Sequence, residues 1–368
     1  MTSFWRRFGL ALALAGLTQA GAAAIKSANA PQPAQTVPAK AAKAKPKPAS
    51  APRPAAPAYL RDRIDALGKA FNGQVGIAVQ SVEGGWQTGW KEDALYPQQS
   101  VSKMWVAITA LDKVDQGRIR LSDKVNMDKS DLTVFHQPIR TRILNGGYTT
   151  SLENLMKLAI TTSDNTANDR LMRAAGGPQA VRAMIASKKL GSIRFYDGER
   201  ALQSRIAGLI WSQSYAIGSA FFEARNALPM TVRRAAFNKY IDDPYDGAAP
   251  AAIVSALARL KRGELLSPSS TTHLLNVMGN TRTGANRLKG GLAPGWSLSH
   301  KTGTGQELGG VQAGYNDIGV LTAPDGKAYA VAVMIKRTST PLPVRMKMMN
   351  EVVRAVIQQH EMTKTGAR

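Results

Sequence analysis

The spacing of apolar residues predicts the first elements of the fold. Between Leu60 and Phe71 apolar side chains recur three or four positions apart, which is the pattern of one helix face. Two short apolar runs, 75–82 and 86–90, flank a Gly-Gly turn and predict a β-hairpin. The segment 104–111 is apolar and contains neither Gly nor Pro, so we expect a buried helix there.

The middle of the chain is predicted to be mostly helical. Thr150 and Glu153 have the spacing of a capping box, which would open a helix over 152–160. Helical spacing recurs over residues 171–175, 180–185 and 253–260.

The C-terminal part returns to strands and ends in a helix. Apolar segments predict the strands at residues 296–305, 313–322 and 327–336. A closing helix is expected after Pro343. Helix, two strands, many helices, three strands and a final helix form an α+β pattern, and nothing in it requires a parallel sheet.

The net charge and its distribution along the chain indicate which kinds of partner to expect. The 368-residue chain carries 48 Lys and Arg against 25 Asp and Glu, a formal net charge of +23. Eight of the basic residues lie in 1–57, which has no acidic residue, and the others are scattered. This distribution does not predict a nucleic-acid-binding face. It fits a solvated basic surface, or attraction to an anionic cell-wall polymer or lipid.

The chain has no cysteine and four histidines, at positions 136, 273, 300 and 360. Disulfides, thiolate chemistry and a lipid-modified N-terminal cysteine are therefore excluded. The histidines lack the spacing of metal ligands, so we expect neither a metal ion nor another cofactor.

The N-terminus predicts export. Residues 1–24 combine an Arg pair, a short apolar stretch and small residues, the pattern of a signal peptide. The general secretory and twin-arginine routes both stay open, as does cleavage of the signal. Residues 25–57 are rich in Pro, Ala and Lys and predict an extended linker, which leaves 58–368 as the folded domain. We expect a periplasmic or secreted protein without stable membrane insertion.

Three short motifs follow one another in the folded part. Ser100 and Lys103 stand three positions apart, so on a helix both side chains lie on one face. A serine hydroxyl becomes a nucleophile when a base takes its proton, and lysine can act as that base where its surroundings lower its pKa. The other two motifs are Ser163-Asp164-Asn165 and Lys301-Thr302-Gly303.

Together the three motifs resemble those of class A serine β-lactamases and penicillin-binding proteins. The resemblance to a class A β-lactamase runs from about Tyr59 to about His360. It implies an α+β fold in which a five-stranded antiparallel sheet is flanked by helices, beside a helical lobe. It also implies a monomer whose substrate is a small-molecule β-lactam or a peptidoglycan stem peptide.

The resemblance further implies roles for the motif residues. Ser100 would attack the carbonyl carbon, with Lys103 as base or proton relay. Ser163 would pass the proton to the leaving nitrogen, and Lys301 would keep the Ser163 hydroxyl polarised. Asn165 would donate to the amide of the substrate's side chain.

The third motif and its neighbours would bind the rest of the substrate. The backbone N–H groups of Ser100 and Thr304 would form an oxyanion hole. Thr302 would bind the substrate carboxylate, and Gly303 would keep the strand edge clear of side chains. Phe135 would stand at the mouth of the cleft, with packing in the core as the alternative.

Glu199 distinguishes hydrolysis from simple acylation. Class A enzymes carry a Glu that activates water against the acyl-enzyme. Glu199 lies in a sequence similar to the family pattern, with Gln203 in place of an Asn. Asp197 replaces an Arg that closes this loop through an ion pair, and Asp169 replaces an Asn that braces it. The usual ion pair therefore cannot form.

The segment 204–245 is enlarged relative to the family. Its apolar residues have partly helical spacing, so we expect an extra helical pair packed on the domain. A partner surface and a lid over the cleft are the alternatives.

Three functions stay open at this point. We expect a serine β-lactamase that forms an acyl-enzyme on Ser100 and hydrolyses it with water activated by Glu199. The second is a D-alanyl-D-alanine peptidase or transpeptidase that uses the same acylation residues. The third is a cell-wall binding module on the same fold that does not turn over its ligand.

Overall fold

The computed structural model describes residues 53–366. The predicted signal peptide, 1–24, and the predicted linker up to residue 52 lie outside the described residues. No helix in the described part of the chain has both the length and the hydropathy that crossing a bilayer requires.

The main sheet is antiparallel. Its strands are β1 (Gln74–Ser81), β2 (Gln87–Trp90), β5 (Ser297–Thr304), β6 (Glu307–Leu308), β7 (Val311–Thr322) and β8 (Ala328–Thr338). The strand order is β2-β1-β8-β7-β5, and the two-residue β6 pairs with β7. A separate sheet consists of β3 (Lys124–Met127) and β4 (Tyr148–Ser151). The predicted α+β class and the antiparallel main sheet are therefore confirmed, with β6 as an addition.

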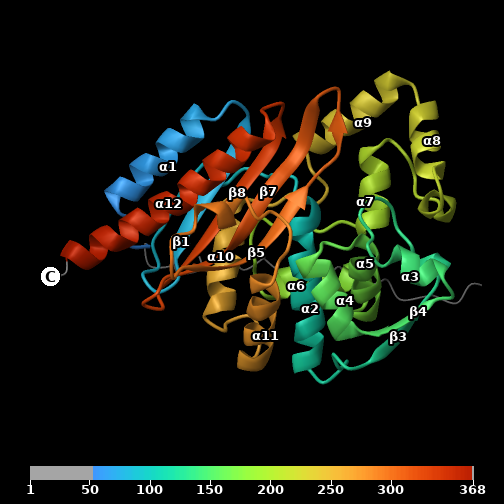
Figure 1. The fold of residues 1–368 in the computed structure, drawn as a ribbon, viewed down its shortest axis with the longest axis horizontal. Coiled ribbons are helices and arrows are strands. Elements are labelled where there is room, and N and C mark those ends of the chain that lie inside the picture. Colours follow the sequence, from blue (N-terminus) through green and yellow to red (C-terminus); the bar gives the residue numbers. More distant parts are fainter. Residues whose placement is uncertain (1–52, 367–368) are drawn as a thin grey trace, which may run out of the picture. The chain divides into compact units, whose positions relative to one another are not determined.

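Helices cover both faces of the main sheet (Figure 1). On one face lie α1 (Ala58–Ala70) and α12 (Leu342–Gly366), and on the other lie α10 (Pro250–Lys261) and α11 (Pro268–Gly279). The side chains of β8 alternate between these two layers, as the pleat of a strand requires. Val331, Val333 and Ile335 share a core with α1 and α12, and Ala330, Ala332 and Met334 share one with α10.

A helical lobe packs around α2 (Lys103–Asp115). The first nine residues of α2, Lys103 to Leu111, are all buried, so the expectation of a buried helix is confirmed. The other helices of the lobe are α3 (Arg140–Leu144), α4 (Leu152–Thr161), α5 (Asn165–Ala174), α6 (Gly177–Ser187) and α7 (Glu199–Ile206).

The capping box predicted at Thr150 and Glu153 is wrong. Thr150 belongs to β4, whose pairing with β3 the apolar spacing did not predict. Ser151 is the N-cap of α4, and its hydroxyl oxygen accepts the backbone N–H of Asn154 at 3.2 Å. The cap lies one residue later than predicted because the strand continues through Thr150.

The segment 204–245 forms the helices α8 (Ala220–Ala227) and α9 (Met230–Asp242) after the end of α7 (Figure 1). The expected helical pair is therefore present, and its buried side chains include Phe221, Phe237, Tyr240 and Ile241. Part of the segment stays in solvent, since Ile210 is 90% exposed.

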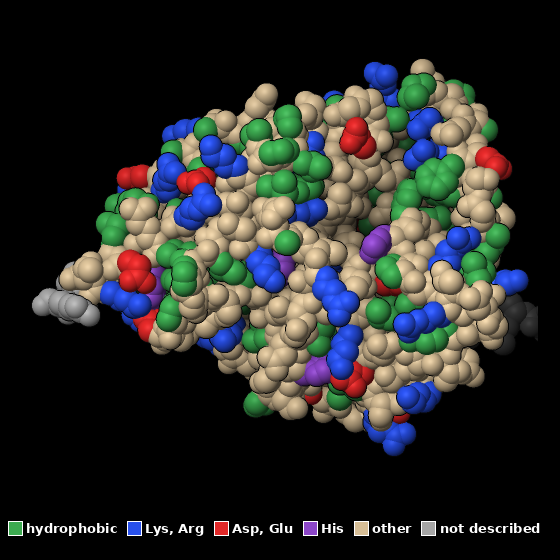
Figure 2. All heavy atoms as spheres, in the orientation of Figure 1, with side chains coloured by type: hydrophobic (Ala, Val, Ile, Leu, Met, Phe, Trp, Pro, Cys, Tyr) green, Lys and Arg blue, Asp and Glu red, His purple; other side chains and the backbone are tan. Residues whose placement is uncertain are grey.

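Figure 2 shows how the basic residues lie on one face of the molecule. On the face shown in Figure 2, Lys and Arg side chains are scattered among apolar and acidic ones and form no stripe. The view agrees with the scattered basic residues of the sequence.

The packing of α12 predicts a sharp contrast between two of its methionines. Met349 is fully buried against the sheet, whereas Met362 on the same helix is 46% exposed. Met349→Ala should lower the free energy of unfolding by about 2–5 kcal/mol, because it removes buried atoms and leaves a cavity. Met362→Ala should cost less than about 0.5 kcal/mol. Denaturant unfolding of both variants measures the difference, and equal losses would contradict this packing.

Candidate active site

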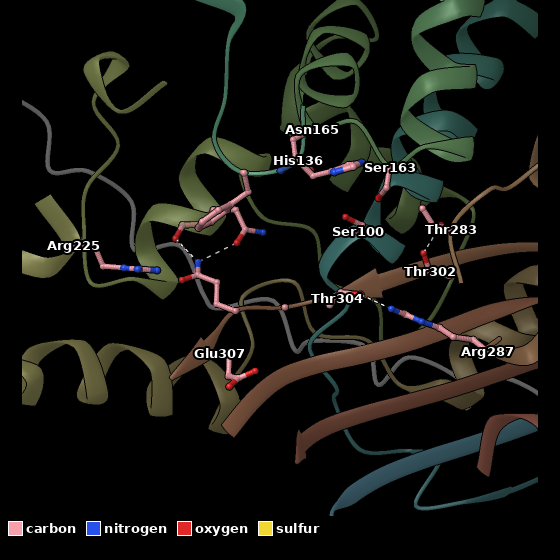
Figure 3. Close-up of a pocket in the computed structure, with 14 residues that line it drawn as sticks. Ser100, His136, Ser163, Asn165, Arg225, Thr283, Arg287, Thr302, Thr304 and Glu307 are labelled. Carbon is pink, nitrogen blue, oxygen red and sulfur yellow. Dashed lines mark hydrogen bonds between the residues drawn. The ribbon is translucent and has the colours of Figure 1, made fainter. Parts of the chain in front are cut away.

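A pocket of about 510 Å³ lies where the helical lobe meets the edge of the sheet (Figure 3). Ser100, Ser163, Asn165, Thr302 and Thr304 all line it, so residues of the three motifs share one site. The volume suits a small-molecule ligand. The described part of the chain holds no group of three or more side chains placed to bind a metal ion.

Lys103 lies at the centre of the buried contacts behind the pocket. The turn η1 (Gln99–Ser102) is a 3-10 helix, and α2 begins directly after it at Lys103. Lys103 Nζ donates to Ser100 Oγ at 2.6 Å and to Asn165 Oδ1 at 2.9 Å, and it also donates to Glu199 Oε1. The Lys103 side chain is buried, and its three N–H donors all have acceptors in the protein.

Glu199 is buried at the first position of α7. The Asp169 carboxylate on α5 accepts the backbone N–H of Glu199 at 2.9 Å and that of Arg200 at 3.3 Å. A carboxylate on the first N–H groups of a helix acts as its cap. Burial, and then the charge of Glu199, raises the pKa of Asp169 against the effect of these hydrogen bonds. Asp169 therefore braces the loop, although the family pattern has an Asn there.

Gln203 lies one helical turn after Glu199 and connects it to the inserted segment. Its Nε2 donates to Glu199 Oε2 and to Gln99 Oε1, both at 3.1 Å. Gln99 Nε2 donates to the Tyr240 hydroxyl of α9 at 2.7 Å, and that hydroxyl donates to Asp246 Oδ1 at 2.9 Å. The long Gln203 side chain is thus oriented on the carboxylate by a partner that the insertion holds in place.

Asp246 also fixes the backbone beside Ser100. Gln99 has a φ of +54°, a conformation that side-chain-bearing residues rarely adopt. Its backbone N–H donates to Asp246 Oδ2 at 2.7 Å. Asp246 is 1% exposed, and burial raises its pKa to about 7. The carboxyl group therefore holds η1 in place, although burial disfavours its charged form.

Asp197 forms an ion pair of its own. Its Oδ1 accepts from Arg182 Nη1 of α6 at 2.9 Å. The same guanidinium nitrogen donates to the backbone oxygens of Phe195 and Tyr196, both at 3.3 Å. The pair is half exposed, so it adds little stability, but it ties the loop before Glu199 to α6.

The second and third motifs meet through Lys301. Its Nζ donates to Ser163 Oγ at 2.9 Å and to the backbone oxygen of Thr302 at 2.8 Å. Lys301 is fully buried, and burial together with the charge of Lys103 holds its pKa well below the ordinary value. The Ser163 hydroxyl accepts from the lysine, so its own hydrogen is free to donate elsewhere.

Arg287 lines the pocket, but the sequence did not point to it. Its Nη1 donates to the backbone oxygens of Gly303 at 3.0 Å and Asn316 at 2.7 Å, and its Nη2 donates to Thr304 Oγ1 at 2.5 Å. The guanidinium carbon lies 3.8 Å from the centroid of the Tyr315 ring. A lone arginine outside a motif carries no spacing signal, so only the fold reveals this position.

The expected reason for Gly303 needs correction. A Cβ on Gly303 would lie 2.4 Å from the backbone oxygen of Gln98, and one on Gly305 would lie 1.6 Å from that of Ala313. The glycines let β5 approach η1 and β7 closely. Gly303 therefore faces protein backbone at this point rather than clearing space for a ligand.

Phe135 stands at the rim of the pocket. It lines the pocket, is 38% exposed and has a φ of +62°. Its ring packs edge to face on Phe221 of α8, with the ring centroids 5.0 Å apart. His136 and Arg225 also line the pocket, and neither was predicted.

Comparisons with known proteins agree with this site. The sequence model of the "Beta-lactamase enzyme family" matches residues 59–360. Beta-lactamase VEB-1 of Pseudomonas aeruginosa is 25% identical over 293 residues, which cover 79% of this chain and 87% of that protein. The crystal structure of TLA-3 extended-spectrum beta-lactamase has a TM-score of 0.67 at 28% identity and covers 82% of this chain and 98% of its own. The structure of an ancestral class A beta-lactamase has a TM-score of 0.65 at 29% identity, and the match covers 82% of this chain and 99% of that protein.

The raised pKa of Asp246 predicts a pH dependence of stability. An aspartate of an unfolded chain titrates near about pH 4, whereas Asp246 titrates at about 7 in the folded state. Between these values the folded state binds more protons, so this group's contribution to the free energy of unfolding falls as pH rises. Its slope is at most about 1.4 kcal/mol per pH unit. Asp246→Asn lacks this slope, so its stability relative to the parent should improve from about pH 5 to about pH 8.

Denaturant unfolding at several pH values measures the difference. Asp242→Asn is the matched control, because it changes an exposed carboxyl four residues before Asp246. Its profile should run parallel to that of the parent. An Asp246→Asn profile that is also parallel across this window would contradict the raised pKa.

Proposed function

The chain belongs to the β-lactamase enzyme family, and we propose that it opens the β-lactam amide with Ser100 as its nucleophile. It is a divergent serine β-lactamase of class A type, which hydrolyses β-lactams. One observation carries our assignment of the hydrolytic step. The buried Glu199 carboxylate contacts Lys103 through one oxygen and lies 3.1 Å from Gln203 Nε2 through the other.

Acylation begins with the proton of Ser100. A proton that moves from Lys103 to Glu199 leaves Lys103 with a free lone pair. Lys103 Nζ, 2.6 Å from Ser100 Oγ, can then take the hydroxyl proton as that oxygen attacks the carbonyl carbon. The backbone N–H groups of Ser100 and Thr304 would stabilise the negative oxygen that develops, and each such donor is worth about 10²–10³ in rate.

The ring nitrogen leaves with a proton from Ser163. Lys301 donates to the same hydroxyl at 2.9 Å, so it can replace that proton. Return of the proton from Glu199 to Lys301 through solvent leaves Glu199 ionised for the second step. Asn165 would bind the acyl amide of the substrate, and Thr302 would bind its ring carboxylate, with Arg287 beside the adjoining Thr304.

Hydrolysis of the acyl-enzyme rests on Glu199. Its carboxylate takes a proton from a water molecule, whose oxygen attacks the acyl carbon. The bond from that carbon to Ser100 Oγ breaks, and the oxygen recovers a proton from Lys103. Glu199 then returns its proton to Lys103, with which it is in contact. Gln203 orients the carboxylate, although it replaces the Asn of the family pattern.

We also propose that the enzyme acts outside the cytoplasm, in the periplasm or after secretion, as a monomer. The support for export is the signal-peptide pattern of 1–24, followed by the Pro- and Lys-rich 25–57.

Substitution of Glu199 separates the two chemical steps. Glu199→Gln should reduce steady-state benzylpenicillin turnover by about 10²–10⁴-fold, because a general base of this kind contributes that factor. The acyl-enzyme should accumulate, because Lys103 without its carboxylate neighbour can release its proton to solvent before it takes that of Ser100. Intact-protein mass spectrometry should detect one drug molecule bound at Ser100.

Two controls define the outcome. Glu153→Gln changes a surface carboxylate of α4 that pairs with Lys157, and it should leave turnover unchanged. Ser100→Gly should form no adduct. A stable adduct on the parent protein would instead indicate a penicillin-binding peptidase or sensor. A parent that shows neither turnover nor an adduct would indicate a binding module.

A further inference from the structure

The inserted segment brings a cation to the active-site pocket. Arg225 of α8 lines the same pocket as Ser100, and in Figure 3 its side chain extends toward the cavity from the end opposite Arg287. The three sequence motifs do not include it. Its position raises the question of which ligand group a second arginine would bind.

Aromatic packing fixes the position of α8. Phe221 is 2% exposed, and its ring contacts those of Phe135 at 5.0 Å and Tyr215 at 5.9 Å between centroids. Phe222 packs edge to face on Phe135 at 6.0 Å, and the Arg225 guanidinium lies 5.2 Å from the Phe222 centroid. The arginine is therefore carried by a packed helix at the rim of the pocket.

The Arg225 guanidinium lacks acceptors. None of its nitrogens makes a hydrogen bond or an ion pair with another residue of 53–366, and its Nε is buried. Burial and the charge of Arg233 both lower its pKa, and no carboxylate of residues 53–366 forms an ion pair with it. Arg287 differs, because its nitrogens already bind three protein oxygens. Arg287 thus keeps two of its five N–H donors, whereas all five of Arg225 have no acceptor among residues 53–366.

The location of Arg225 indicates which part of the substrate it would contact. Phe135, which packs on α8, adjoins Val134, whose backbone oxygen accepts from Asn165 Nδ2 at 2.9 Å. Arg225 therefore lies on the Asn165 side of the pocket, away from Thr302. In the proposed function Asn165 binds the acyl amide, so a side chain that continues from that amide points toward Phe135 and Arg225.

We propose that Arg225 forms a subsite for a carboxylate on the acyl side chain of the β-lactam, so that the enzyme favours substrates with a second negative charge. This inference rests on the proposed function and names the substrate class of the same site. A guanidinium binds a carboxylate through two parallel N–H donors, which gives orientation as well as affinity.

A matched pair of substrates tests the subsite. One is a cephalosporin with a glutaryl side chain, and the other is its analogue in which the terminal carboxylate is a primary amide. The parent should show a higher kcat/KM for the carboxylate. Arg225→Gln should reduce this preference by about tenfold, as the loss of a charge-assisted hydrogen bond predicts, and Arg225→Lys should retain part of it.

Controls separate the subsite from the chemistry and from general charge. Arg233→Gln removes a nearby positive charge of α9 and should change the preference far less than Arg225→Gln does. Benzylpenicillin, whose side chain is uncharged, reports on the proposed function itself. If the parent is only acylated, acylation rates of the same pair decide the question instead. An unchanged carboxylate-to-amide ratio in Arg225→Gln would overturn the subsite, whatever the benzylpenicillin result.

Discussion

The buried ammonium of Lys103 is the constraint on which the site depends. A charged group that is 1% exposed has lost almost all of its water, so each N–H must find an acceptor in the protein. The acceptors are Ser100 Oγ in η1, Asn165 Oδ1 at the start of α5 and Glu199 Oε1 at the start of α7. Satisfying one lysine therefore fixes three segments around α2. The same contacts gather the Ser100 hydroxyl, an amide and a carboxylate at one place.

The inserted segment takes part in this arrangement. A positive φ at a residue with a side chain costs about 1–3 kcal/mol, and Gln99 carries such strain directly before the nucleophile. Three hydrogen bonds offset it, since Gln99 donates to Asp246 and to Tyr240 and accepts from Gln203. Tyr240 belongs to α9, so the insertion supports both η1 and the Gln203 side chain, which contacts Glu199.

Local spacing was sufficient to predict most of the helices and strands and the three motifs, because each depends on neighbours in the sequence. The cap at Ser151 was missed because it depends on strand pairing outside its own segment. Asp169, Asp197 and Gln203 differ from the family pattern, so the sequence suggested that contacts around Glu199 are missing. In the fold each of the three has a hydrogen-bond partner. The partner of Asp169 lies 30 residues away in the sequence, so local spacing could not predict it. The hydrogen-bond partners of Arg287 lie 16 to 29 residues away in the sequence, so no local pattern could identify it.

The charges of the pocket explain why an anionic substrate suits it. The buried Lys103 and Lys301 contact Ser100 and Ser163 from behind the pocket, and Glu199 contacts Lys103. Arg225, Arg287 and the acidic Glu307 line the pocket itself. Burial and like charge lower the pKa of Lys301, so its protonated form is disfavoured before substrate binds. A bound carboxylate adds the opposite charge and shifts Lys301 back toward the protonated form. The hydrogen bond from Lys301 to Ser163 then becomes charge-assisted and stronger. In the proposed mechanism, substrate binding thus prepares Ser163 to protonate the leaving nitrogen.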